Sequence, residues 1–345
     1  MPMMAANGDP TPESGRGPST PWWEALERHG DMGHRVIEFD WAATEVGPLE
    51  EWPPAVRVAV TFCLGTLFPT SLLIGERLRV IFNDAAREIY GQARYFEALG
   101  QPSNEVWPEA TTQVGDLVAE VTRTGRPFFA VDRLVYLNRN VPGEECYFTF
   151  CYTPVIGDDG EVQGVLATFF ETTRQMLAER RLNTVARLGR ASFQASTDTA
   201  LAVAALPVLA ENAADHPAGA LYRSPRSGEA SPIELAEFGQ VPDGDLVAAL
   251  VKACLASGQV QHAGSLHAFP VTPPEKTSPS HVVLLRHNDA RHWDAELENY
   301  LALVAATIGS ALLDQGELWA ERRQVARAAA LDAAKSAFFA AINHE

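Results

Sequence analysis

The chain has 345 residues, of which 46% are hydrophobic and 21% charged, so it is long enough for two ordinary domains with connecting segments. Acidic residues outnumber basic ones by 44 to 27, and the formal charge of −17 argues against a large surface for nucleic acid or an anionic membrane. No Cys-x-x-Cys pair occurs among Cys63, Cys146, Cys151 and Cys254, so neither a zinc site nor a disulfide framework is predicted, and a reducing cytoplasm fits.

The N-terminal segment is expected to be a disordered tail over residues 1–35. Its first twenty residues are rich in Pro, Gly and Ser and contain no apolar core, so they do not read as a signal peptide. After these twenty residues, Trp22 to His29 can form a short helix.

The stretch from Val58 to Gly75 has no charged residue and is about as long as the shortest membrane-spanning helix. It also contains several Thr and Ser residues, and Pro69 would break a helix near its middle. We therefore predict a soluble helix from Ala55 to Leu67, then a buried strand, and no membrane contact.

The next elements predict a small antiparallel sheet with helices on one side. Residues 71–74 and 78–82 read as a hairpin, Asn83 and Asp84 can cap a helix over 85–90, and Gly125 is well placed to end a helix over 116–124. Three further apolar runs read as strands, the last two joined by a Gly-Asp-Asp-Gly turn: 128–137, 146–154 and 162–170.

Several motifs in this region resemble the PAS sensor domains of bacteria. They are Phe-Asp-Trp-Ala-Ala-Thr (39–44) with Gly-Pro-Leu (47–49), Phe-Asn-Asp-Ala (82–85), Val-Trp-Pro-Glu (106–109) and Tyr-Phe-Thr-Phe-Cys-Tyr-Thr-Pro-Val (147–155). The resemblance implies a PAS-like domain over residues 36–173, with a ligand-sized pocket closed by the sheet. No histidine lies between His34 and His216, which argues against haem held by a histidine in this domain. The cysteines lack the Asn-Cys-Arg-Phe setting of flavin photoreceptors, so an apolar ligand, or none, remains.

Residues 174–190 are expected to be a connecting signalling helix. Its apolar stripe runs from Met176 through Leu182 to Leu188, with arginines around it. The stripe can pack on its own domain or form a short parallel coiled coil, and both readings stay open.

Residues 191–313 alternate helices and strands and end in a long helix, and this order resembles a GAF domain. We expect strands at 219–223, 233–239, 266–271 and 281–286, and helices at 201–214, 245–257 and 294–313. The residue sets that bind cyclic nucleotides or bilins in that family are absent. No repeated ligand spacing marks a metal site, so we assign no role to the six histidines here: His216, His262, His267, His281, His287 and His292.

Residues 314–345 are expected to start a dimerisation and phosphoacceptor helix, because apolar residues recur at a nearly coiled-coil period. The terminal Lys-Ser-Ala-Phe-Phe-Ala-Ala-Ile-Asn-His-Glu (335–345) resembles the H-box of sensor histidine kinases, although Asn343 stands where that family usually has Ser. The resemblance implies that His344 is the phosphoacceptor and Glu345 the general base.

The sequence as a whole suggests an α+β protein in which PAS-like and GAF-like sensor domains precede a coiled-coil-type helix. The implied function is the sensory and phosphoacceptor portion of a cytoplasmic two-component histidine kinase. It would act as a homodimer, take phosphate from ATP with Mg through a kinase domain in cis or in trans, and pass it to the receiver domain of a response regulator. The sequence contains no ATP-binding motif, so we expect no activity from this chain alone. The alternative is a non-enzymatic small-molecule sensor or scaffold that feeds a different output.

Overall fold

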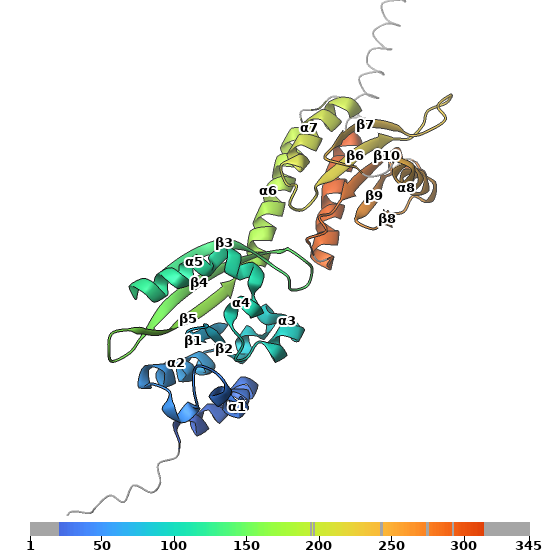
Figure 1. The fold of residues 1–345 in the computed structure, drawn as a ribbon. Coiled ribbons are helices and arrows are strands. Elements are labelled where there is room, and N and C mark those ends of the chain that lie inside the picture. The colour runs from blue at the N-terminus through green and yellow to red at the C-terminus, as the bar shows by residue number, and fades with distance from the viewer. Residues whose placement is uncertain are drawn as a thin grey trace, which may run out of the picture. The chain divides into compact units, whose positions relative to one another are not determined.

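The computed structural model describes residues 21–313, apart from residues 194, 196, 242–243, 274–275 and 292 and the side chains of residues 92 and 93. The chain folds into two compact units, each containing a five-stranded sheet (Figure 1). Of the described residues, the first unit holds 21–135 and 148–171, and the second holds 136–147 and 172–313. Antiparallel sheets accompanied by helices confirm the predicted α+β class.

The first unit opens with two helices, η1 (Trp22–Arg28) and α1 (Gly30–Glu38). The short helix predicted over Trp22 to His29 is confirmed by η1. The disordered tail was expected to extend to residue 35, and α1 shows that its last residues are helical instead. The physical reason is burial, because Leu26, Met32 and Val36 are completely covered and tie the helices to the unit.

Helix α2 (Pro54–Gly65) is followed by strand β1 (Thr70–Ile74), as the sequence predicts, although the helix ends two residues before Leu67. Pro54 opens the helix, where its missing N–H costs nothing. Every residue of β1 is buried, because α2 packs against this strand. Within the part of the chain that the structure describes, no helix is both long enough and apolar enough for a membrane span.

The first sheet has the strand order β2-β1-β5-β4-β3. The predicted hairpins are confirmed, since β1 pairs with β2 and β4 pairs with β5, both antiparallel. Gly125 takes a left-handed conformation directly after α5 and ends it. The remaining elements are β2 (Arg79–Phe82), β3 (Phe128–Leu137), β4 (Glu144–Ile156), β5 (Val162–Glu171), η2 (Trp41–Ala43), η3 (Leu49–Glu51), η4 (Asp84–Ala86), α3 (Arg87–Glu97), α4 (Ser103–Val106) and α5 (Pro108–Thr124).

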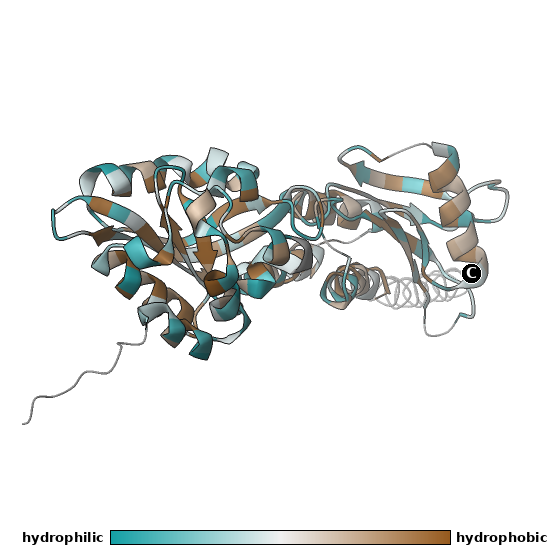
Figure 2. Ribbon diagram, turned by 60° about the horizontal axis from the view of Figure 1, so that its bottom comes forward, coloured by the Kyte–Doolittle hydropathy of each residue, from teal (hydrophilic) through white to brown (hydrophobic). Residues whose placement is uncertain are grey.

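The second unit has a central sheet of order β7-β6-β10-β9-β8 with helices on both faces. One core joins the sheet to α6, α7 and a helix over residues 295–313, and the other joins the opposite face to α8. Figure 2 shows hydrophobic residues along the strands and on the helices that cover them. The elements are α6 (Thr173–Phe193), α7 (Asp198–Ala210), β6 (Ala218–Arg223), β7 (Ile233–Phe238), α8 (Gly244–Ser257), β8 (Gln261–Ala263), β9 (Leu266–Val271) and β10 (His281–Arg286).

The structure of α6 shows how part of its apolar stripe is used, for which the sequence left two alternatives: packing on its own domain or forming a coiled coil. Leu188 is fully buried and Val185 packs beside it in the core of the second unit, so this end of the stripe packs on its own domain. Leu182 is 70% exposed, whereas the neighbouring Arg181 is buried. The arginines were expected around the stripe, so the burial of Arg181 requires a partner, which is described below.

Candidate functional site

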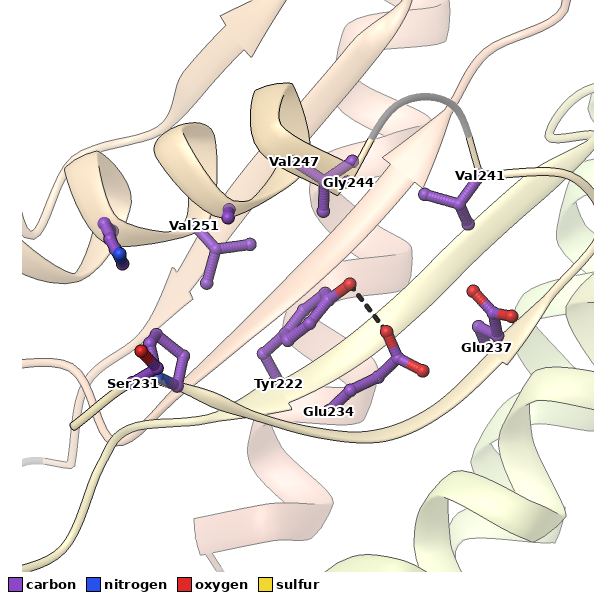
Figure 3. Close-up of a pocket in the computed structure, with 11 residues that line it drawn as sticks. Tyr222, Ser231, Glu234, Glu237, Val241, Gly244, Val247 and Val251 are labelled. Atoms are coloured by element: carbon purple, nitrogen blue, oxygen red, sulfur yellow. Dashed lines mark hydrogen bonds between the residues drawn. The ribbon is translucent and has the colours of Figure 1, made fainter. Parts of the chain in front are cut away.

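The two residues to which the sequence assigns catalytic roles, His344 and Glu345, lie outside the described residues, as does the whole segment 314–345. Among the pockets in the described part of the chain, the candidate site is one in the second unit. It lies between α8 and the edge of the sheet formed by β6 and β7, and its volume is about 360 Å³ (Figure 3). That volume is within the range of small-molecule sites in proteins.

A β-bulge determines which side chains face this pocket. In the pairing of β7 with β6, Ala236 lies opposite Leu221 and Glu234 lies opposite Tyr222, so Leu235 is an extra residue without a partner. Residues three apart in a regular strand point to opposite faces. The extra residue cancels that difference, so Glu234 and Glu237 both lie on the face that α8 covers (Figure 3).

The polar chemistry of the pocket centres on Tyr222, whose hydroxyl donates a hydrogen bond of 2.8 Å to Oε2 of Glu234. Burial raises the pKa of this phenol, and the hydrogen bond and charge of Glu234, with the charge of Glu237, raise it further. Tyr222 therefore stays protonated and remains a donor at neutral pH. The opposite wall is apolar and comes from Val247 and Val251 of α8, with Val241 just before the helix.

The interior of the first unit is filled by aromatic side chains. Tyr90 stacks on Phe82 with ring centroids 4.1 Å apart, meets the edge of Trp107 at 5.3 Å, and shares a hydrogen bond of 3.0 Å with Ser71. On the sheet, Phe150 and Tyr152 lie 4.9 Å apart. Pockets of about 370 and 350 Å³ also lie on the first unit, but charged side chains such as Arg94 and Glu97 make up much of their lining. The pocket beside α8 has a wall of valines, so it is the better candidate for a small-molecule site.

Three of the histidines that the sequence left without a role come together in the second unit. Nε2 of His267 lies 3.0 Å from Nδ1 of His287, and His262 stacks beside His267 at 6.0 Å. The ring of Trp293 stacks on His267 at 4.4 Å. Burial, with the neighbouring His287 and His262, lowers the pKa of His267 to about 4. Among the described residues, no group of three or more His, Cys, Asp or Glu side chains is arranged to hold a metal ion.

A buried ionic cluster, made of Glu145, Arg180, Arg181, Asp215 and Arg291, also lies within the second unit. Asp215 is completely buried and accepts hydrogen bonds from Nε of Arg180 at 3.0 Å and from Arg181 at 3.4 Å. Glu145 accepts from Arg180 at 2.6 Å and also pairs with Arg291. Burial by itself raises the pKa of Asp215, but the hydrogen bonds and charges of Arg180 and Arg181 outweigh it and hold this pKa below its usual value.

The ionic cluster explains why Arg181 is buried on a helix face that the apolar pattern assigns to solvent. Its carboxylate partner is 34 residues away in the sequence, so no periodicity along α6 could reveal it. The pocket could not be predicted from the sequence either, because the positions of Glu234 and Glu237 depend on a bulge that only the strand pairing shows.

Comparison with known proteins shows a similarity to a known family for part of the chain. Residues 72–176 match the family model described as the PAS fold, which agrees with the PAS-like motifs in the sequence. No match to a curated protein was found.

Solved structures of separate sensor domains are similar to parts of the chain. One is the PAS domain of a protein from Colwellia psychrerythraea, with 15% identity, a TM-score of 0.27 and coverage of 34% of this chain and 98% of that one. Another is the GAF domain of a phosphoenolpyruvate-protein phosphotransferase from Acinetobacter, with 11% identity, a TM-score of 0.31 and coverage of 38% of this chain and 91% of that one. A third is a sensory box sensor histidine kinase from Vibrio cholerae, with 13% identity, a TM-score of 0.23 and coverage of 34% of this chain and 88% of that one. These scores are low, so the similarity to PAS domains rests on the match over residues 72–176.

Proposed function

We propose that this chain is the sensory and phosphoacceptor portion of a two-component sensor histidine kinase. The observation that carries the proposal is the H-box resemblance of residues 335–345, which follows a segment that matches the PAS fold and a second α+β unit with a ligand-sized pocket. In this reading the second unit is a GAF-type domain and its pocket is the place where a small molecule biases the output helix.

The proposed reaction is transfer of the γ-phosphoryl group of ATP to a ring nitrogen of His344. An N–P bond forms, the bond between the γ-phosphorus and the bridging oxygen breaks, and ADP leaves with Mg. Glu345 accepts or orients the proton on the other ring nitrogen, which keeps the attacking nitrogen nucleophilic. The phosphoryl group then passes to an aspartate of a response regulator. ATP is held by a kinase domain in cis or in trans, and two copies of the chain pair through the apolar side of the terminal helix.

The proposal is tested by radiolabelled ATP. The chain fused to a complete kinase core should incorporate label that acid removes and base does not, and His344→Gln should abolish it. His34→Gln is the matched control, because His34 is exposed and remote in sequence from the H-box. Label that persists in the His344→Gln protein would dispose of the phosphoacceptor assignment. The unfused chain should stay unlabelled.

The alternative, a sensor or scaffold with a different output, is favoured only by the pocket itself, because a ligand site requires no phosphoacceptor. It predicts that ligand binding is intact while His344→Gln leaves every downstream response unchanged. Measuring the phosphorylation of a response regulator alongside ligand binding separates the two functions.

A further inference from the structure

The charges around the pocket beside α8 indicate which chemical class of ligand it can hold. Two carboxylates, Glu234 and Glu237, lie on the pocket side of β7 because of the bulge at Leu235. The ring of Tyr222 lies between β7 and α8, and its hydroxyl is already directed at Glu234 (Figure 3). Carboxylates and the face of an aromatic ring are the two groups that proteins use to bind organic cations.

The pocket also has two positive groups, the N-terminus of α8 and Lys252, and neither outweighs the two carboxylates. The N-terminus of α8 begins at Gly244 and carries the equivalent of about half a positive charge. Asp245 lies in the first turn of the same helix, where it opposes that charge. Lys252 also lines the pocket, but it is eight residues along α8 from Gly244, a rise of roughly 12 Å. The end of the pocket near Glu237 and Val241 is therefore negative, and the wall beyond it is apolar.

We propose that this pocket binds a small organic cation, in which an ammonium or guanidinium group sits between the two carboxylates and the Tyr222 ring while a short aliphatic body lies along Val247 and Val251. The inference rests on the proposed role of the pocket as the ligand site and adds the class of ligand. It is independent of phosphate transfer to His344.

Three probes of similar size and different charge test the ligand class on the full chain. Isoamylamine is cationic, isoamyl alcohol is neutral and isocaproate is anionic, and all three carry the same branched aliphatic end. Isothermal titration calorimetry should show isoamylamine binding about tenfold or more tightly than the alcohol, and no binding of isocaproate.

The variants assign the binding to the pocket. The double change Glu234→Gln and Glu237→Gln keeps an acceptor for the Tyr222 hydroxyl while removing both charges, and it should weaken isoamylamine by about tenfold or more. Ala248→Trp, which fills the space beside α8, should abolish binding. Glu298→Gln is a control for loss of negative charge away from the pocket, because it removes an exposed charge from a helix on the other face of the sheet and should change nothing.

Three other outcomes would contradict the inference, and each points to a different error. Tighter binding of isocaproate that Ala248→Trp abolishes would show a ligand site of the wrong class. Amine binding that survives both pocket changes would be attraction to the acidic chain in general. Failure of all three probes would reject the pocket as a site for such molecules, and the labelling of His344 would still be decided by its own assay.

Discussion

Replacing Asp215 by Asn should destabilise the second unit far more than replacing a surface carboxylate would. Asp215 is the only completely buried acidic residue among the described residues, and its carboxylate lies within ion-pair distance of Arg180, Arg181 and Arg291. Asparagine preserves the size and one acceptor but removes the charge. Three guanidinium groups would then have Glu145 as the remaining anion of the ionic cluster.

The size of the effect follows from the cost of a buried charge that has lost its partner, which is about 3–5 kcal/mol. The amide oxygen of Asn still accepts a hydrogen bond, so we expect the lower end, about 3 kcal/mol. For a unit of roughly 150 residues this corresponds to a fall in Tm of about 6–12 °C. The pKa of Asp215 is lowered in the folded protein, so its contribution is fully present at neutral pH and is lost only as the pH falls below the usual range of an aspartate.

Differential scanning calorimetry at pH 7 measures the change, and hydrogen exchange in β6 and α6 shows that it belongs to the second unit. Glu296→Gln is the control, since Glu296 pairs with Arg174 at 2.6 Å in an exposed position and should contribute no more than about 1 kcal/mol. If Asp215→Asn lowers the free energy of unfolding by less than the control does, the electrostatic reasoning is wrong.

Two further predictions concern a buried amide and the histidine group. Asn83→Ala should lower the free energy of unfolding of the first unit by about 3 kcal/mol, measured by urea unfolding. The Asn83 side chain accepts hydrogen bonds from the N–H groups of Thr70 and Ala86 and donates to the carbonyls of Thr66 and Phe68, at 2.7–3.2 Å. The control Thr61→Ala, at an exposed position, should have little effect, and equal effects of the two changes would contradict this account. For His267, a folded pKa of about 4 against an ordinary 6.5 means that the neutral ring is favoured, so the stability of the second unit should be fully present above about pH 6.5 and decline as the pH falls towards 4. Thermal melting at several pH values across this range should show a weaker dependence of Tm on pH in His267→Gln than in the unchanged protein. An unchanged dependence of Tm on pH would refute the assignment.

Sequence patterns predicted the elements whose neighbours are close along the chain. The hairpin at residues 71–82, the stop at Gly125 and the run of buried residues in β10 are each marked by local turn chemistry or hydrophobicity. Strand β8 was missed because its three residues are too short to show a period. Helix α1 was missed because its apolar residues, Met32 and Val36, are few and sit among polar ones.

The features that define the candidate site depend on pairing between distant segments. Nothing near Arg181 in the sequence points to Asp215, and nothing near His267 points to His287, which follows β10 and is twenty residues away. Alternation along β7 would place Glu234 and Glu237 on opposite faces. Only the register with β6 reveals that they share one.

The extra residue in β7 has a consequence for how such a pocket can change its preference. Shortening the strand by Leu235 would leave Glu234 and Glu237 two positions apart, so regular alternation would keep both carboxylates on the face that α8 covers. A pairing of β7 with β6 that kept Leu235 but lost the bulge would instead turn one of the two carboxylates toward the other side of the sheet, without altering any residue of α8 that lines the cavity. The acidic charge of this pocket therefore depends on the register of β7 with β6 as much as on the identity of the side chains.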